Sequence, residues 1–262
     1  MEQSIDSIGK KVCDIAVSVG GYLKEEQQQL KKSAIELKSV RNYVTYIDKE
    51  AEKRLVEKLG GIIPDAGFLT EEATVEYVRK ESVWIIDPLD GTTNYVHGDT
   101  PFSVSIALMK NGEIILGVVY DPIADELFYA AGTGGALLNG KPIRVSDKDK
   151  LKNGYVGFGI PYSLSVEGEK IVRNAMGMFR ECTFRIKGSA AIEICYVACG
   201  RADAYFHSGL SPWDVAAGAF ILKRAGGKPT DFSRGDDYLF GKEIVASNGK
   251  IHEDVMRVII GR

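Results

Sequence analysis

Six short apolar segments separated by tight turns occupy the middle of the chain, and they restrict its fold more than any other feature of the sequence. Asn-Gly, Asp-Pro and glycine-rich turns lie between these segments. Short consecutive strands joined by tight turns favour antiparallel pairing, so this region is predicted to form an antiparallel sheet. The predicted strands are 68–69, 83–87, 103–109, 114–120, 126–130 and 135–138.

Helices are predicted on both sides of this strand-rich region. Apolar residues three or four positions apart, from Ile5 through Val12 to Val19, predict an amphipathic N-terminal helix. The second half of the polar segment 25–42 is predicted to be a loop, and a strand at 43–47 and a helix over 48–59 follow it. Further helices are predicted at 170–180, 190–198, 215–225 and 252–260, and further strands at 155–158, 204–206 and 243–246. A change of pattern near residue 146 divides the chain into two α/β halves, 1–145 and 146–262.

Composition and charge argue against several classes of protein. The 262 residues are 45% hydrophobic and 26% charged and carry a net charge of −3, as in an ordinary soluble globular protein with a buried core. A nucleic-acid-binding surface would need a basic face. The N-terminus lacks the apolar stretch of a secretory signal, and no run of about 18 apolar residues is present to span a membrane. We therefore expect a cytoplasmic protein without a nucleic-acid or membrane partner.

Cysteine and histidine usage predicts neither a disulfide framework nor a zinc site. Cys13, Cys182, Cys195 and Cys199 show no CxxC spacing, and buried thiols in a reducing compartment are the expected state. The three histidines form no HExxH pattern. The chain has more acidic than basic side chains, which is compatible with a site built from carboxylates instead.

The most informative segment is 84–94, which reads WIIDPLDGTTN. An apolar strand runs into Asp87, Pro88 is expected to end that strand, and the Asp90-Gly91 pair is expected to form a tight turn. The two threonines that follow are expected to cap the next element, which leaves backbone N–H groups free to bind an anion. Two carboxylates this close repel each other, and a divalent cation relieves the repulsion. Mg²⁺ suits them because it prefers oxygen ligands and phosphate partners.

Each acidic residue also has an ordinary structural explanation. The Asp-x-x-Asp-Gly segment alone could be a strand end with an Asx-type cap. Asp214 precedes the small-residue run 215–219 and Asp48 precedes a predicted helix, so either could be an N-cap that contributes about 1 kcal/mol. Glu71 and Glu72 end the segment GFLTEE and could bring a further carboxylate to the same edge.

Longer motifs decide between these readings. WIIDPLDGTTNYVHG at 84–98 and PWDVAAGAFILKRAGG at 212–227 resemble the two signature motifs of the inositol monophosphatase family, within the lithium-sensitive phosphatase superfamily. YVTYID at 43–48, GFLTEE at 67–72 and GSAA at 188–191 match the family's pattern in the expected order. The resemblance covers essentially the whole chain. It implies the layered αβαβα sandwich of the fructose-1,6-bisphosphatase-like sugar phosphatases, a homodimer and inhibition by Li⁺.

The resemblance also implies roles for individual residues. Glu71, Asp87 and the backbone carbonyl of Leu89 would hold one Mg²⁺, and Asp87, Asp90 and Asp214 would hold a second, with two or three ions in all. Thr92, supported by Asp48, would position a metal-bound water and help to deprotonate it, with Glu71 also in the catalytic set. Asp90, Gly91 and Thr92 would contact the phosphate end of the substrate, and Gly188, Ser189 and Ala190 would line the pocket for a sugar or polyol.

This set of residues suits the hydrolysis of a phosphate monoester, which is among the slowest uncatalysed reactions known. Two ions about 3.5–4 Å apart neutralise the phosphate oxygens and lower the pKa of a bound water, so no covalent nucleophile is needed. We therefore predict a Mg²⁺-dependent phosphatase that acts on a small polyol or sugar phosphate, most simply an inositol-1-monophosphatase-type activity.

His207 departs from the family pattern, because animal inositol monophosphatases carry there a glutamate that contacts ring hydroxyls. A histidine accepts one hydrogen bond where a carboxylate accepts two, and His207 could equally be a surface residue at a strand end. A 3′(2′),5′-bisphosphate nucleotidase or a fructose-1,6-bisphosphatase therefore stays open. Thr93 and Asn94, where nucleotidases tend to have a lysine, favour the monophosphatase branch. Outside enzymes, the alternative is a regulatory partner in a transcription complex with a vestigial site.

Overall fold

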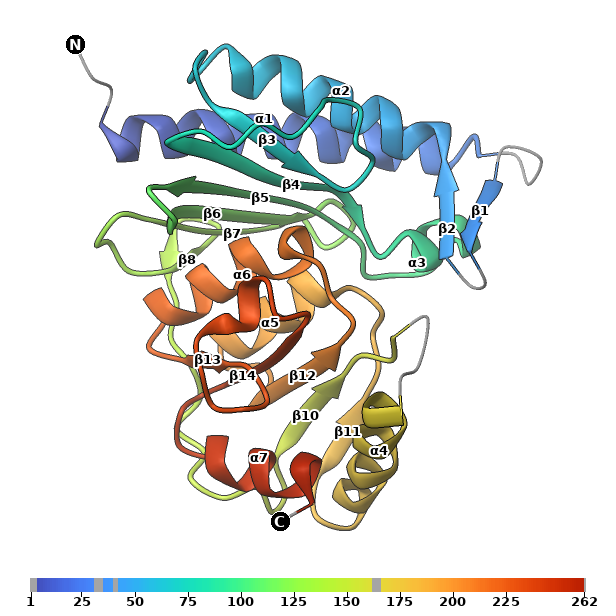
Figure 1. Cartoon of the computed structure of the whole chain (residues 1–262), viewed down its shortest axis with the longest axis vertical. Coiled ribbons are helices and arrows are strands. Elements are labelled where there is room, and N and C mark those ends of the chain that lie inside the picture. Colours follow the sequence, from blue (N-terminus) through green and yellow to red (C-terminus); the bar gives the residue numbers. More distant parts are fainter. Residues whose placement is uncertain (1–3, 31–34, 40–41, 162–165, 262) are drawn as a thin grey trace.

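The computed structural model describes residues 4–30, 35–39, 42–161 and 166–261. These residues form five layers in which helices and sheets alternate (Figure 1). Helices α1 (Ile5–Gln27) and α2 (Tyr46–Gly60) form one outer layer, α5 (Ala190–Ala198) and α6 (Pro212–Arg224) form the middle layer, and α4 (Val166–Ala175) and α7 (His252–Ile260) form the other outer layer. One sheet lies on each side of the middle layer. The predicted αβαβα sandwich is confirmed.

The larger sheet has seven strands in the order β3-β4-β5-β6-β7-β8-β9. Every neighbouring pair from β4 onward is antiparallel, as the tight turns predict. The pair β3–β4 is parallel, because residues 71–81 form a connection long enough to return the chain to the start of the sheet. The strands are β3 (Gly67–Thr70), β4 (Ser82–Asp90), β5 (Ser103–Lys110), β6 (Glu113–Asp121), β7 (Glu126–Ala131), β8 (Leu137–Leu138) and β9 (Lys141–Pro142).

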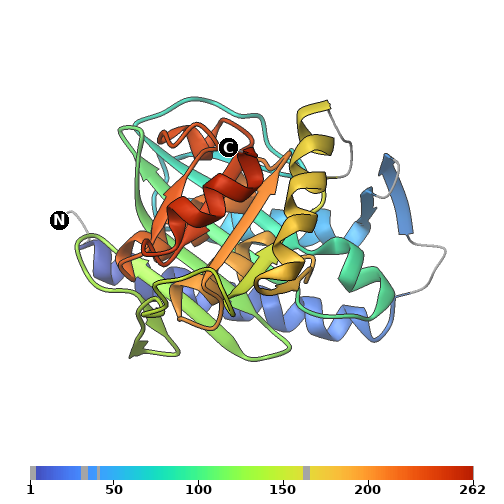
Figure 2. The same ribbon diagram turned by 90° about the horizontal axis from the view of Figure 1, so that it is seen from below.

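The smaller sheet has five strands in the order β11-β10-β12-β14-β13, with parallel and antiparallel pairs. Figure 2 shows α7 and α4 lying across its outer face. The strands are β10 (Tyr155–Phe158), β11 (Thr183–Arg185), β12 (Ala204–Ser208), β13 (Lys228–Thr230) and β14 (Glu243–Ser247). β11 and β13 are not among the predicted strands, because three residues are too few to show an alternating pattern. We propose that the division near residue 146 follows the two sheets.

Three hydrophobic clusters fill the spaces between the layers. Trp84 and Ile86 of β4 face α1 and α2, whereas Ile85 faces α5 and α6, as the two-residue repeat of a strand requires. All three side chains are at most 1% exposed. The third cluster lies between the smaller sheet and α4 and α7. β4 is therefore buried on both faces, which explains its uninterrupted apolar sequence before Asp87.

The prediction for residues 34–47 is wrong in two respects. The segment predicted as a loop contains β1 (Ile35–Ser39), which pairs antiparallel with β2 (Asn42–Thr45); residues 31–34 and 40–41 lie outside the described residues. The predicted strand 43–47 ends at Thr45, because Thr45 is the N-cap of α2 and Tyr46 already begins that helix. Asp48 is thus the third residue of the helix and not its cap.

Helix α6 packs directly on the larger sheet because glycine permits a close approach there. A Cβ at Gly117 of β6 would lie 2.7 Å from the backbone oxygen of Ala217, and one at Gly218 would lie 3.1 Å from Ile194 of α5. The small-residue run 215–219 therefore serves to seat α6 against its neighbours. This seating brings the first turn of α6, with Asp214, close to β4.

Among the described residues, every helix is too short or too polar to cross a membrane. All four cysteines are free thiols; Cys182 and Cys195 are buried, and Cys13 and Cys199 are half-buried. The predicted absence of a disulfide framework agrees with these free thiols.

Candidate functional site

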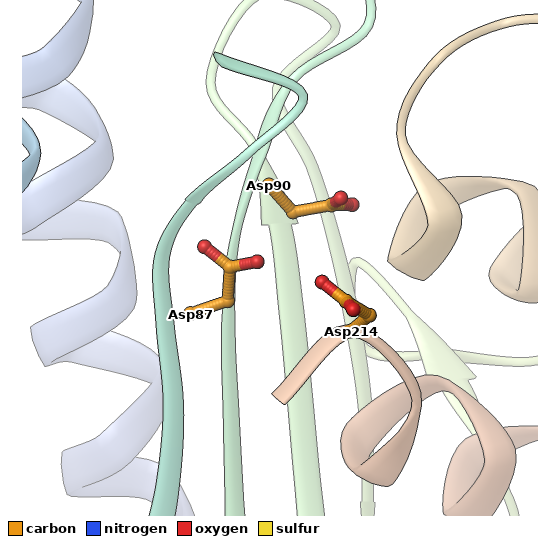
Figure 3. A group of neighbouring side chains, drawn as sticks. All are labelled: Asp87, Asp90 and Asp214. Carbon is orange, nitrogen blue, oxygen red and sulfur yellow. The ribbon is translucent and has the colours of Figure 1, made fainter. Parts of the chain in front are cut away.

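Three carboxylates from two elements converge between the larger sheet and the middle helices. Asp87 and Asp90 of β4 and Asp214 of α6 point toward one another (Figure 3). One carboxylate oxygen from each lies within 4.8 Å of the others; Asp87 and Asp90 are buried and Asp214 is half-buried. Clustered carboxylate oxygens are the donors that a hard divalent cation prefers, so this cluster could hold a metal ion.

An irregularity in β4 places Asp87 and Asp90 on the same side. Residues three apart in a regular strand face opposite sides of the sheet. The register with β5 shifts between Asp87, which pairs with Ser105, and Asp90, which pairs with Ser103. Pro88 therefore interrupts the strand without ending it, contrary to the sequence prediction, and the extra residue turns both carboxylates to the site. The backbone N–H of Leu89 then donates to Oδ1 of Asp87 at 2.9 Å.

The N-terminus of α5 fixes the orientation of Asp90. Oδ2 of Asp90 accepts from the Ser189 hydroxyl at 2.5 Å and from the Ala191 N–H at 2.9 Å, and Oδ1 accepts from the Ala190 N–H at 3.2 Å. A negative charge is favoured at a helix N-terminus, where backbone N–H groups lack partners within the helix. Ser189 is fully buried, so its hydroxyl orients Asp90 from behind the site.

Asp214 is the third residue of α6, and its carboxylate closes a capping box. Its Oδ2 accepts from the backbone N–H of Ser211, the N-cap, at 2.6 Å. The helix begins at Pro212, three residues before the predicted start at 215. The Ser105 hydroxyl donates to the carbonyl of Trp213 at 3.1 Å, which ties this helix start to the strand opposite Asp87.

Burial and mutual repulsion disfavour ionisation of the three carboxyl groups. Burial raises the pKa of Asp87 well above its ordinary value, and the charges of Glu71, Asp90 and Asp214 raise it further. The pKa of Asp214 is raised in the same way, by burial and then by Asp90 and Glu71. Burial raises the pKa of Asp90 to about 6 in spite of the hydrogen bonds from α5. A bound cation would remove the repulsion, so the cluster fits a metal ion better than it fits three free carboxylates.

Glu71 lies near this cluster but outside the group of three that could share one ion. Its backbone N–H donates to Ile86 at 3.3 Å, so it extends the β3–β4 pairing to a position beside Asp87. Its charge contributes to the raised pKa values of Asp87 and Asp214.

Thr92 and Asp48 form a second feature beside the cluster. The Thr92 hydroxyl lies 3.0 Å from the carbonyl of Leu89 and 3.3 Å from Oδ1 of Asp48. Oδ2 of Asp48 accepts from the N–H of Thr45 at 2.8 Å and from its hydroxyl at 2.7 Å. Burial raises the pKa of Asp48, although the hydrogen bonds from Thr45 oppose that shift.

Gly91, and not Thr92 or Thr93, is the N-cap of the helix that follows β4. It is the N-cap of α3 (Thr92–His97), which has no side-chain cap, so the prediction that Thr92 or Thr93 caps the next element is wrong. The φ of Gly91 is 94°, in the left-handed region that favours glycine. A Cβ there would lie 3.0 Å from the carbonyl of Pro101 and 3.2 Å from that of Gly188. The backbone can therefore turn sharply between Asp90 and Thr92.

A cavity of about 560 Å³ opens beside the acidic cluster. Residues from both sheets and their loops contribute to its wall. Of the residues predicted to contact substrate, it is lined by Asp90, Gly91, Gly188, Ala190 and His207, and Asp214 also reaches it. Thr92 and Ser189 are not among its lining residues.

His207 is a half-buried residue of the cavity wall. Its Nδ1 lies 2.9 Å from the Tyr205 hydroxyl. Its Nε2 is buried and, like the buried hydroxyl of Thr93 on the same cavity, has no hydrogen-bond partner within the described part of the chain. Burial lowers the pKa of His207 to about 4, against a smaller opposing effect of the Ile160 backbone. The imidazole is therefore neutral at physiological pH.

Glu193 is a cavity residue that sequence reasoning missed. It is 3% exposed and lines the cavity from α5. Burial raises its pKa to about 8, although hydrogen bonds from the backbone of Lys187 and Gly188 oppose the shift. A single carboxylate in the otherwise apolar helix 190–198 was the signal available in the sequence.

Comparison with known proteins finds relatives that match nearly the whole chain. Residues 5–259 match the model of the inositol monophosphatase family. The "Nus factor SuhB" of Vibrio cholerae is 40% identical over 235 residues, which cover 89% of this chain and 88% of that protein. The "Fructose-1,6-bisphosphatase/inositol-1-monophosphatase" of Thermotoga maritima is 40% identical over 221 residues, which cover 84% of this chain and 83% of that protein. The crystal structure of the extragenic suppressor protein SuhB from Bartonella henselae is similar with a TM-score of 0.89 at 34% identity, and the match covers 97% of this chain and 98% of that chain.

Proposed function

The chain belongs to the inositol monophosphatase family, and from that premise we propose that it is a Mg²⁺-dependent phosphatase that hydrolyses a phosphate monoester of a small polyol or sugar. Inositol 1-phosphate is the leading substrate. The observation that carries the proposal is the convergence of Asp87, Asp90 and Asp214 at the edge of a cavity large enough for such a substrate.

The donor set fits the metal that the family implies. Asp87, Asp90 and Asp214 would share one ion, and Glu71 with Asp87 and the carbonyl of Leu89 would hold another, with two or three ions per site. When bound, these ions supply charge neutralisation for the phosphate and activation of the attacking water. The raised pKa values of the three aspartates support the assignment. Without a cation, ionisation of these buried and mutually repelling carboxylates is unfavourable, and a bound cation would relieve the repulsion.

We assign the handling of the water's proton to Thr92 and Asp48. The single proton on the Thr92 hydroxyl has two acceptors, the carbonyl of Leu89 and Oδ1 of Asp48. Donation to Asp48 turns the threonine oxygen into an acceptor for a water proton. The raised pKa of Asp48 makes its carboxylate a stronger base than an exposed aspartate, which suits a group that receives a proton.

The remaining cavity residues would bind the substrate. Asp90 and the backbone of Gly91, which line the cavity, would contact the phosphate end together with the backbone of the adjacent Thr92. Gly188 and Ala190 would line the wall against the ring, with Ser189 holding Asp90 behind them. The unpartnered atoms of His207 and Thr93 support a ligand rich in hydroxyl groups, because each buried polar atom needs one hydrogen bond that the described chain does not supply.

A substrate panel tests the proposal. Phosphate release should be measured with inositol 1-phosphate, glycerol phosphate, fructose 1,6-bisphosphate and a 3′,5′-bisphosphate nucleotide, each with Mg²⁺. The proposal predicts the highest kcat/KM for a polyol or sugar monophosphate. Preference for the nucleotide would assign the chain to the nucleotidase branch, and preference for the fructose ester to the bisphosphatase branch. Hydrolysis of none of the four would refute phosphatase function.

A second, non-enzymatic function is favoured by the name Nus factor that the Vibrio cholerae relative carries. We propose that this chain can also act as such a factor. In a strain that lacks the gene, an Asp87→Asn variant separates the two roles. Growth restored by this variant supports the regulatory role, and growth restored only by the unchanged protein assigns the phenotype to phosphatase activity. We further propose a cytoplasmic homodimer that Li⁺ inhibits, which light scattering, cell fractionation and inhibition assays check directly.

A further inference from the structure

Glu52 of α2 is a buried carboxylate with no part in the proposed chemistry. It is fully buried, and its hydrogen-bond partners lie at the end of β3 and in the loop that follows. Its Oε1 accepts from the Thr70 hydroxyl at 2.9 Å, from the Thr74 N–H at 2.7 Å and from the Thr74 hydroxyl at 2.7 Å. Its Oε2 accepts from the Glu72 N–H at 2.7 Å. One carboxylate thus receives four hydrogen bonds from residues 70–74.

These four hydrogen bonds enclose Glu71. The residues before and after it, Thr70 and Glu72, both donate to Glu52, and its own N–H donates to Ile86 beside Asp87. Ala73, within the same loop, has a φ of 50°, in the left-handed region that costs energy for any residue with a Cβ. The loop therefore holds a conformation that its own sequence does not favour, and Glu52 supplies the interactions that keep it there.

We propose that Glu52 is a positioning residue that fixes the 70–74 loop and so directs the carboxylate of Glu71 toward Asp87. The inference rests on the proposed function, because it assigns to Glu52 the preorganisation of a metal ligand. Because its hydrogen bonds hold the residues on both sides of Glu71, removing Glu52 should weaken metal binding.

The hydrogen-bond pattern explains why a carboxylate is required. All four groups around Glu52 are donors, and an ionised carboxylate is an acceptor at both oxygens. A glutamine has the same shape but carries an NH₂ in place of one oxygen. In one orientation that NH₂ faces the N–H of Glu72, and in the other it faces the N–H of Thr74. Glu52→Gln therefore places a donor against a donor in either orientation.

The test compares Glu52→Gln with Glu57→Gln, an exposed glutamate on the same helix that loses the same charge. Mg²⁺ affinity is measured by calorimetry on the full chain, and Tm is measured in EDTA. Outer residues that orient metal ligands typically change affinity 10- to 100-fold, so Glu52→Gln should raise the Kd for Mg²⁺ by about tenfold or more. Its kcat at saturating Mg²⁺ should stay within about threefold of the unchanged protein, because Glu52 touches no reacting atom. Glu57→Gln should change neither the Kd for Mg²⁺ nor kcat.

A lower Tm for Glu52→Gln with an unchanged Kd for Mg²⁺ would show a purely structural role and overturn the inference. If Glu52→Gln does not fold, Thr74→Val tests the inference instead. This variant removes one of the four groups that donate to Glu52, the Thr74 hydroxyl, and keeps the backbone N–H of residue 74. A raised Kd in Thr74→Val supports positioning, and an unchanged Kd overturns it. Failure of the proposed function gives a different result, in which the unchanged protein neither binds Mg²⁺ nor releases phosphate.

Discussion

Asp48 and Asp214 occupy the same position in two helices that lie on opposite faces of the larger sheet (Figure 1). Each is the third residue of its helix, and each accepts a hydrogen bond through Oδ2 from the backbone N–H of its own N-cap residue, at 2.8 Å for Asp48 and 2.6 Å for Asp214. The capping box fixes one oxygen and so sets the direction of the other. Two ordinary helix starts thereby aim carboxylates at one site from both faces.

Replacement of Asp87 tests its central place in the cluster. Asp87→Asn should lower kcat by about three orders of magnitude, because several kcal/mol of charge stabilisation depend on the ions it would hold. Its Tm in EDTA should stay equal or rise, since asparagine keeps an acceptor for the Leu89 N–H and removes a buried like charge. Asp121→Asn is the matched control, a buried aspartate that only accepts from the backbone of a turn, and it should keep full activity. Unchanged turnover in Asp87→Asn would refute the role of this residue.

The Thr92–Asp48 pair should act as one unit. Thr92→Val should lower kcat by about a hundredfold, the usual contribution of a positioned proton-transfer group. Thr92→Ser, which keeps the hydroxyl, should retain most activity. Asp48→Asn should give a similar loss of kcat, and the double variant should lose little more than either single one. Losses that multiply in the double variant would show that the two residues act separately. The measurement is steady-state kinetics of all four proteins.

His207 should contribute to substrate choice and not to the chemical step. His207→Ala removes one hydrogen bond of about 1 kcal/mol, so KM for a polyol phosphate should rise about fivefold. Hydrolysis of p-nitrophenyl phosphate, which has no hydroxyl to bind, should change less than twofold. Because the pKa of His207 is about 4, this difference should be constant from pH 6 to pH 8. An equal loss with both substrates would argue that His207 acts on the phosphate end.

Mg²⁺ affinity should rise with pH through the acidic range. The pKa of Asp90 is raised from 3.8 to about 6, so below pH 6 the folded protein holds a proton that the cation must displace. Affinity should therefore rise as pH increases toward that pKa, by about tenfold per pH unit for each proton displaced, and level off above it. Without metal, the contribution of Asp90 to folding stability changes with pH in the direction opposite to the Mg²⁺ affinity. The unfolded chain releases its proton first, so this group's contribution to folding falls as pH rises from 3.8 toward 6. Calorimetry in buffers of different ionisation enthalpy counts the protons released, and a pH-independent affinity would contradict the assignment.

Sequence patterns predicted most of the fold, because long periodic segments carry a strong signal. The short apolar segments and tight turns within 83–120 predicted the sheet, and the apolar repeat of α1 predicted its outer helix. The β1–β2 hairpin was missed because it sits inside a polar segment that resembles a loop. The starts of α2 and α6 were predicted late, because Asp48 and Asp214 were considered as possible caps. Thr45 and Ser211 are the caps, and each helix begins at the next residue.

The acidic cluster could be predicted from motifs, but its supporting contacts could not. The register shift at Pro88 and the hydrogen bonds from α5 to Asp90 depend on tertiary packing, which local patterns do not encode. Glu193 and Glu52 were missed for the same reason. Glu193 and Glu52 both lie on helices, and only the fold shows that their carboxylates are buried.

The most direct test of the account is a Mg²⁺ titration of protein freed of metal by EDTA, with phosphate release from inositol 1-phosphate as the readout. We expect no turnover above background in EDTA and full recovery as Mg²⁺ is added, with no recovery in Asp87→Asn. Hydrolysis that proceeds at the same rate in EDTA would show that the three carboxylates do not work through divalent cations and would contradict the proposed mechanism.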